Sequence, residues 1–116
     1  MFVKKKDKTA GRPVIIEIDG IKFKTSDGEK NKEIEKIAKL YPKRLNDIVV
    51  FMANHGIFDM FGDKTLDELE NSLGTPMIRT DAKQIIYANH NLDTEHIISM
   101  EYAGDLEEFY NLVIDG

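Results

Sequence analysis

Cysteine is absent from the 116 residues of this chain. Without thiols the chain can form neither disulfide bonds nor zinc–thiolate sites, and thiol catalysis is excluded. The absence fits a reducing cytoplasm. Long apolar runs are missing as well, so we expect no membrane span. The charged start MFVKKKDKTAGRP also lacks the apolar region of a signal peptide. We therefore expect a soluble cytoplasmic protein with no membrane partner.

Common catalytic motifs are missing too. The chain has no G-x-S-x-G elbow, no Walker loop and no G-x-G-x-x-G, and its eight glycines stand as isolated turn or cap residues. No persuasive arrangement of His and Asp accompanies Ser26, Ser72 or Ser99. We expect no cofactor and no enzymatic activity.

The composition is that of a folded domain. Hydrophobic residues make up 41% of the chain and charged residues 32%, a globular balance rather than a disordered one. A chain of this length can bury one core without metals or disulfides. We expect a single domain over residues 1–116, with residues 1–12 forming a flexible basic arm or an edge strand.

The formal net charge of −5 is unevenly distributed. Residues 1–56 hold 13 Lys or Arg against 8 Asp or Glu, whereas residues 57–116 hold 3 against 13. The two parts therefore carry +5 and −10. Such an asymmetry can steer a charged partner through its long-range field, although two solvated faces of one domain would carry the same charges.

The N-terminal region has the pattern of a β-hairpin. Val14–Ile18 and Ile21–Lys24 contain residues that favour strands and flank Asp19-Gly20. This dipeptide suits the positive φ angles of a type I′ turn. A hairpin over these residues is predicted.

Helical periodicity follows. One helix face is formed by Ile34, Ile37, Ala38 and Tyr41. Pro42 interrupts the pattern and favours the first turn of a new helix. The spacing then returns in Leu45, Ile48, Val49 and Met52. Gly56 suits the left-handed residue after the helix end. A further helix is indicated by the capping-box spacing of Thr65 and Glu68, with Gly74 as its stop.

The rest of the chain has strand patterns, in MIRT, KQIIYANH, EHIISMEYAG and LEEFYNLVID. With strands at 84–90 and 96–102, Asn91–Glu95 form the loop between them. The fold class predicted is α+β, with an N-terminal β-hairpin, two to three helices in the middle and a C-terminal antiparallel β-meander.

Histidines and carboxylates gather around this loop, as His90, Asp93, Glu95 and His96. His90, Asp93 and His96 are the candidates for a metal or acid–base site, because His and carboxylates serve together as metal ligands. The spacing matches no metal signature, and Asn91 and Asp93 are ordinary turn residues. We favour a structural role, and the alternative is a small metal-binding or hydrolytic enzyme that uses these three residues.

The last hairpin suggests a second candidate site. If Gly104-Asp105 is a two-residue turn, Glu101 lies opposite Glu108, and like charges in that position are destabilising. Val113 then faces the core with Ile98, Met100 and Phe109. The other face is partly apolar through Ile97, Tyr110 and Leu112, which favours partial cover by a helix. The basic groups of a partner would relieve the repulsion, so the partner-binding candidates are Glu101, Asp105, Glu107 and Glu108.

A basic stripe on the expected helix is formed by Lys32, Lys36, Lys39 and Lys43. Lysines could contact phosphates, but Glu33 and Glu35 alternate with them and the chain is acidic overall. A solvated helix face is the favoured interpretation. A regulatory module associated with nucleic acid is the alternative.

The segment HIISMEYAGDLEEFYNLVIDG, within Glu95–Gly116, resembles the closing strands of small Gram-positive bacterial domains of uncharacterised function. Some of these domains are immunity proteins of polymorphic or contact-dependent toxin systems. The resemblance rests on the EEFY strand and the terminal IDG. It implies an α+β, non-catalytic, acidic binding domain and assigns no particular residues. A basic protein partner, such as a toxin domain, is the partner we expect, and charge complementarity would speed its association. Homo-oligomerisation is left open.

Overall fold

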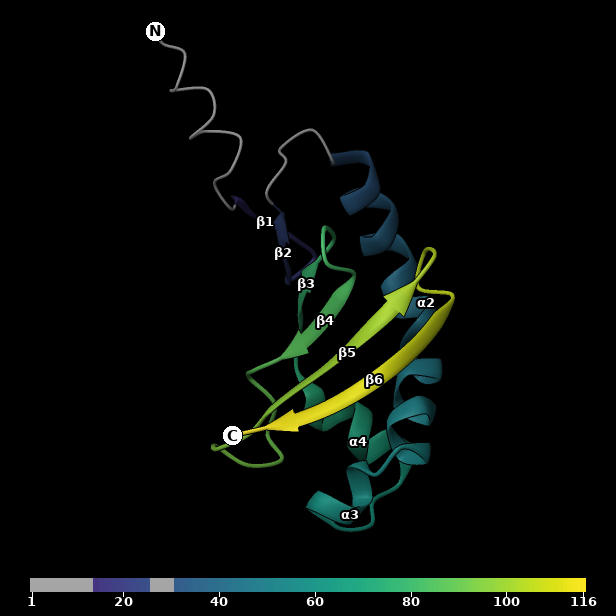
Figure 1. The fold of residues 1–116 in the computed structure, drawn as a ribbon, viewed down its shortest axis with the longest axis vertical. Coiled ribbons are helices and arrows are strands. Elements are labelled where there is room, and N and C mark those ends of the chain that lie inside the picture. Colours follow the sequence, from purple (N-terminus) through teal and green to yellow (C-terminus); the bar gives the residue numbers. More distant parts are fainter. Residues whose placement is uncertain (1–13, 26–30) are drawn as a thin grey trace, which may run out of the picture.

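The computed structural model describes residues 14–25 and 31–116. Two short strands come first, followed by three helices and four further strands (Figure 1). The strands are β1 (Val14–Ile18), β2 (Ile21–Thr25), β3 (Met77–Arg79), β4 (Gln84–Tyr87), β5 (Ile97–Ala103) and β6 (Glu108–Asp115). The helices are α2 (Asn31–Asn54), α3 (Ile57–Phe61) and α4 (Leu66–Leu73). The predicted α+β class is confirmed, with the N-terminal hairpin, three helices and antiparallel strands β4 to β6.

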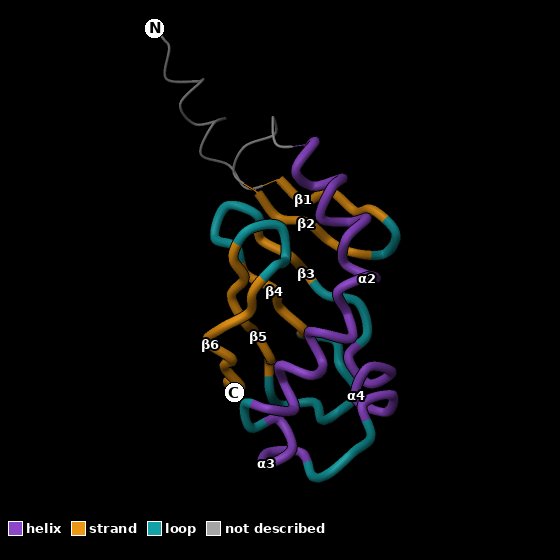
Figure 2. The backbone as a smooth tube through the Cα atoms, turned by 90° about the vertical axis from the view of Figure 1, so that its right-hand side faces the viewer, coloured by secondary structure: helices purple, strands orange, loops and turns teal. Residues whose placement is uncertain are grey.

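The six strands form one sheet in the order β1-β2-β3-β4-β5-β6. All neighbours are antiparallel except β2 and β3, which are parallel. The three helices connect these two strands, because a parallel pair needs a long crossover rather than a tight turn. The helices lie on one side of the sheet (Figures 1 and 2). We call the other side the open face.

The N-terminal hairpin has the predicted turn. Val14 pairs with Thr25 and Ile18 with Ile21, so Asp19 and Gly20 are the two loop residues. Their φ angles of 54° and 85° are both positive, as a type I′ turn requires. The local sequence is sufficient to determine this element.

The predicted break at Pro42 is wrong, since α2 continues through it. The residues with helical spacing on either side of Pro42 lie in one apolar stripe from Ile34 through Tyr41 to Met52, and all are buried except Leu45, which is partly buried. Packing of this continuous stripe outweighs the cost of proline in a helix interior, about 3 kcal/mol, which arises from the lost hydrogen bond and from the clash of the ring with the preceding turn. Pro42 itself is exposed.

The helix ends follow the sequence signals. Gly56 has φ 101° and ψ 5°, the left-handed conformation expected after α2. Thr65 caps α4: its hydroxyl accepts from the Glu68 N–H at 3.1 Å, and the Glu68 carboxylate accepts from the Thr65 N–H at 2.8 Å. No helix in the described parts of the chain is both long and apolar enough to cross a bilayer.

The core lies between the helices and the sheet. Buried side chains of α2 and α4 pack here with those that the strands direct to the same side: Phe23, Ile78, Ile85, Tyr87, Ile98, Met100 and Tyr102. The Tyr41 and Tyr87 hydroxyls form a hydrogen bond with each other inside this layer. This bond joins α2 to β4.

The predicted register of the last hairpin is wrong. Glu101 lies opposite Tyr110, and Ala103 lies opposite Glu108. The turn has four residues rather than two, because Leu106 takes a positive φ of 62° and is fully buried. Burial of this leucine is a tertiary requirement that the Gly104-Asp105 pattern does not reveal.

The pairing also shifts along the hairpin. Ser99 pairs with Val113, so between this pair and Glu101–Tyr110 the strand β6 has one residue more than β5. Asn111 has a φ of 54° and marks a β-bulge, where a left-handed residue is common. Beyond the bulge Val113 is directed to the open face and is 47% exposed, not part of the core as predicted.

Candidate functional site

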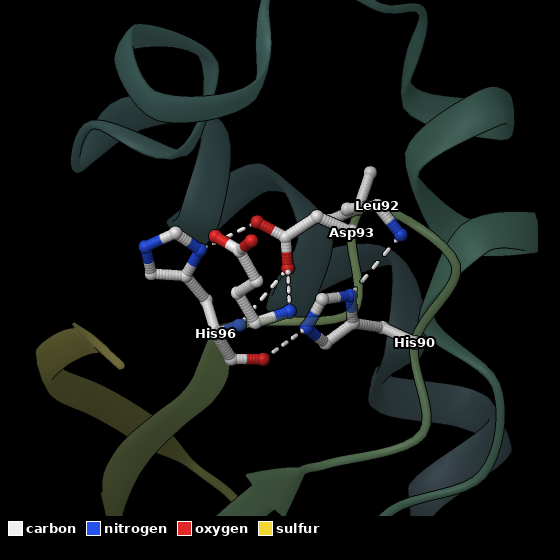
Figure 3. Close-up of polar contacts among 5 residues, drawn as sticks. His90, Leu92, Asp93 and His96 are labelled. Atoms are coloured by element: carbon white, nitrogen blue, oxygen red, sulfur yellow. Dashed lines mark hydrogen bonds and ion pairs between the residues drawn. The ribbon is translucent and has the colours of Figure 1, made fainter.

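His90 lies in the β4–β5 loop and is 6% exposed. It is not at a strand end as predicted, because β4 stops at Tyr87. The Leu92 N–H donates to Nδ1 of His90 at 3.1 Å, so Nε2 carries the proton that is donated to the His96 carbonyl at 2.6 Å (Figure 3). Both ring nitrogens are thus used within the loop. This imidazole closes the loop on itself and has no free lone pair for a metal.

Asp93 organises the other side of the loop. One of its carboxylate oxygens accepts the N–H groups of Glu95 and His96, each at 3.0 Å. The other oxygen lies 2.5 Å from Nδ1 of His96 (Figure 3). Burial alone would raise the pKa of Asp93, but the hydrogen bonds from the His96 ring and the two N–H groups outweigh it, so the pKa is lowered. The charged carboxylate is the form that the loop stabilises.

Phe61 of α3 packs against both histidines. Its ring meets those of His90 and His96 edge-on, at centroid distances of 5.9 Å in each case. Among residues 14–25 and 31–116, no group of three or more His, Asp or Glu side chains is arranged to hold a metal ion. The structure brings His90, Asp93 and His96 into one hydrogen-bonded loop. The side chains of His90 and Asp93 bond to the backbone of the loop, and the ring of His96 bonds to the Asp93 carboxylate.

The four acidic candidates do not form one surface. Glu101 and Glu108 are directed to the open face, as the alternation of exposed and buried residues along β5 and β6 indicates. Glu101 accepts a hydrogen bond from the Asn111 amide at 2.9 Å. Glu108 is exposed, and since it lies opposite Ala103 the two carboxylates are not direct cross-strand neighbours.

Asp105 and Glu107 lie in the turn, which leans toward α2. Asp105 forms an ion pair of 2.7 Å with Lys36. Arg44 donates to the backbone carbonyls of Leu106 at 2.8 Å and Glu107 at 3.2 Å. The basic helix therefore compensates part of the acidic turn. The hydrogen bond and charge of Asp105 raise the pKa of Lys36.

The lysine stripe is exposed along α2, as a solvated helix face would be. Lys36 contacts Asp105 within the chain. The stripe and the acidic turn are separate candidates in the sequence, and the fold joins them through Lys36 and Asp105.

The sequence predicts only part of the apolar group on the open face, because it assigns Ile97, Tyr110 and Leu112 to that face and Val113 to the core. Ile97, Tyr110 and Val113 are 48%, 42% and 47% exposed. The expected helix cover is wrong here, because the helices lie on the opposite side (Figures 1 and 2). Val113 could have been assigned to this face only with the bulge at Asn111 known. We call Ile97, Tyr110 and Val113, with the flanking carboxylates Glu101, Glu108 and Asp115, the β5–β6 patch.

A cleft of about 350 Å³ lies on the open face as well, over strands β1 to β4. Glu17 and Lys22 line it and are direct cross-strand partners. Met77 and Ile86, also paired, contribute its apolar lining. Because the two charges neutralise each other, the cleft does not select a ligand of one sign.

Comparison of the chain with protein-family models, with curated proteins and with solved structures yields no match.

Proposed function

We propose that this protein is a non-enzymatic protein-binding domain that neutralises a basic partner, in the way an immunity protein neutralises a toxin. The observation that carries the proposal is the β5–β6 patch, where three large exposed side chains adjoin three carboxylates. Protein interfaces commonly combine an apolar centre containing aromatic residues with a polar rim.

The arrangement of the patch supports recognition by burial. Ser99 and Val113 are direct partners, and Ile97 lies opposite Asp115, so Ile97 and Val113 are diagonal neighbours. Tyr110 lies opposite Glu101 on the far side of the bulge. A partner that covers these residues gains hydrophobic free energy and meets carboxylates at the edge.

The charge of the C-terminal part supports a basic partner. Residues 57–116 carry 13 acidic against 3 basic residues. Complementary charge raises association rates and disfavours acidic competitors. This property suits a protein that must capture a toxin quickly.

The test is affinity capture from a lysate of the source organism at low and high salt. A basic protein should be retained, and it should inhibit growth when expressed alone but not together with this chain. A neighbouring gene that encodes a large toxin would point to the same partner. Failure to retain any basic protein at either salt would overturn the proposal.

Variants locate the contact. Replacing Tyr110 and Val113 together by Ser should abolish capture, because these residues supply the apolar part of the patch. Both are exposed, so the replacements should not disturb the core. Met60→Ser is the matched control, since Met60 is 50% exposed but lies on α3. Equal loss of capture in both variants would show that the patch is not the binding site.

A further inference from the structure

Strand β6 is the last strand of the sheet and has β5 as its one strand neighbour within the described residues. An edge strand presents backbone N–H and C=O groups on its outer side, and such groups can pair with another chain. In Figure 1, β6 is the outermost of the C-terminal strands. It is eight residues long, enough for a sustained ladder.

The side chains of β6 limit which chain can pair there. Glu108 and Asp115 are the first and last residues of the strand, and both are exposed. Tyr110 and Val113 lie between them and are exposed on the open face. The edge is therefore acidic at both ends and apolar in the middle.

A second copy of this chain does not fit that pattern. In the antiparallel self-pairing that overlaps the whole of β6, Glu108 of one copy lies opposite Asp115 of the other, at both ends. Like charges directly opposite each other destabilise a strand pair. A strand with Lys or Arg at both ends would instead form two attractive pairs.

We propose that an extended segment of the partner, with basic residues flanking apolar ones, adds to the sheet as a seventh strand along β6. Backbone hydrogen bonds supply affinity in this mode, and alternate side chains supply specificity. The partner's apolar side chains cover Tyr110 and Val113, and its basic ends meet Glu108 and Asp115. This inference rests on the proposed function, because it specifies how the basic partner is held.

The opposite edge provides an internal control. Among residues 14–25 and 31–116, strand β1 forms the other edge of the sheet, with Ile15 57% exposed. Its neighbour β2 carries Lys22 and Lys24, which lie opposite Glu17 and Ile15. A basic segment is therefore expected to prefer β6 to β1.

The experiment uses the full chain and synthetic peptides of seven residues, so that both end residues lie on one face. One peptide is Lys-Thr-Val-Thr-Val-Thr-Lys, which places Lys and Val on the same face, and a second has Glu in place of Lys. Amide hydrogen exchange and NMR titration should show saturable binding of the Lys peptide, with slowed exchange along β6 and not along β1. The Glu peptide should bind about tenfold more weakly, because two attractive charge pairs become repulsive.

Two further peptides test the backbone ladder. Each carries N-methyl groups on one of the two alternate sets of residues in the Lys peptide. In a strand ladder successive N–H groups point to opposite sides, so one methylated peptide should lose binding and the other should keep it. If both bind, or neither does, the strand-addition proposal is overturned.

Charge reversal in the protein tests the contacts proposed for the two ends of β6. The variant with Glu108→Lys and Asp115→Lys should prefer the Glu peptide. The control with Asp59→Lys and Asp63→Lys changes the net charge equally at exposed sites on α3 and the loop after it, and should keep the preference for Lys. Unchanged preference in the β6 variant, or slowed exchange on β1 alone, would contradict the proposal.

The two proposals can fail separately. If a basic protein is captured but the Lys peptide does not protect β6, the binding function stands and strand addition is overturned. If the peptide binds along β6 but no basic protein is captured, the edge binds basic strands and the neutralising function is overturned. Association of the protein with itself, detected by sedimentation and lost when Tyr110 and Val113 are both replaced by Ser, would identify a second copy as the occupant and overturn the inference.

Discussion

The Nε2–H of His90 donates to the backbone carbonyl of His96 at 2.6 Å, across a loop of five intervening residues. The same ring accepts the Leu92 N–H. A histidine that looked like a metal ligand in the sequence thus holds the β4–β5 connection closed. The conformation of the loop before β5 depends on this side chain.

Replacing His90 by Ala should lower the free energy of unfolding by roughly 2–4 kcal/mol, because the ring is buried and its loss leaves the partly buried His96 carbonyl and Leu92 N–H without their partner. Urea unfolding followed by circular dichroism measures this change. His55→Ala is the control: His55 is exposed and follows the end of α2, where its ring bonds to the Phe51 carbonyl, so its loss should cost about 0.5 kcal/mol or less. Equal effects of the two variants would contradict the structural role of His90.

The acid stability of the loop should depend on Asp93. Its folded pKa lies below the ordinary value of 3.8, so the carboxylate stabilises the fold above that value and the contribution is lost as the pH falls through the folded pKa. Asp93→Asn should therefore be less stable than the wild type at neutral pH, and the difference should shrink below about pH 4. Thermal unfolding between acid and neutral pH tests this. A difference that stays constant with pH would exclude the carboxylate charge as its cause.

At high pH the buried tyrosines should weaken the fold. Burial raises the pKa of Tyr41 to about 12, although the bond to Tyr87 partly offsets it, and burial also raises the pKa of Tyr87 well above its ordinary value. The neutral phenols are the stabilised form, so their contribution is complete below the ordinary pKa of about 10 and is lost as the pH rises through 12. The variant with Phe at both positions should lose less stability between these pH values. Tyr110→Phe is the control, because Tyr110 is half exposed, and its pH profile should match that of the wild type.

Pro42 should limit the stability of α2. Pro42→Ala restores a donor for the Ala38 carbonyl in an exposed part of the helix, and we expect a gain of about 1–3 kcal/mol. Lys43→Ala is the neighbouring exposed control and should change the free energy of unfolding by about 0.5 kcal/mol or less. A gain no larger than that of the control would indicate that α2 is interrupted at Pro42 after all.

The bulge in β6 should depend on the backbone at position 111. Asn111→Val places a β-branched residue at a φ of 54° and removes the hydrogen bond to Glu101. We expect a loss of roughly 1–3 kcal/mol. Asn111→Gly loses the same hydrogen bond but adopts positive φ freely, so it should be clearly more stable than the Val variant in chemical unfolding. If the two were equally stable, the register with the bulge would be wrong.

Local chemistry was enough for several elements. The Asp19-Gly20 turn, the Thr65–Glu68 capping box and the left-handed Gly56 each depend on a few adjacent residues, and each follows its sequence signal. The spacing of apolar residues also located the strands and the helices between them. The α+β class follows from the order of these elements, which the sequence states directly.

Other features depend on residues far apart in the chain. The continuity of α2 through Pro42 is decided by packing of both helix halves on the sheet, and the register of β5 and β6 by burial of Leu106. The parallel pairing of β2 with β3 requires the helices between them to cross the sheet. Spacing alone could not distinguish the two histidines from metal ligands. The backbone groups that bond to both ring nitrogens of His90 come into place only in the folded loop. The sequence determined the acidic charge and the kinds of elements. Only the tertiary structure decided which carboxylates lie beside exposed apolar residues, because a shift of one residue in a strand moves every side chain to the other face.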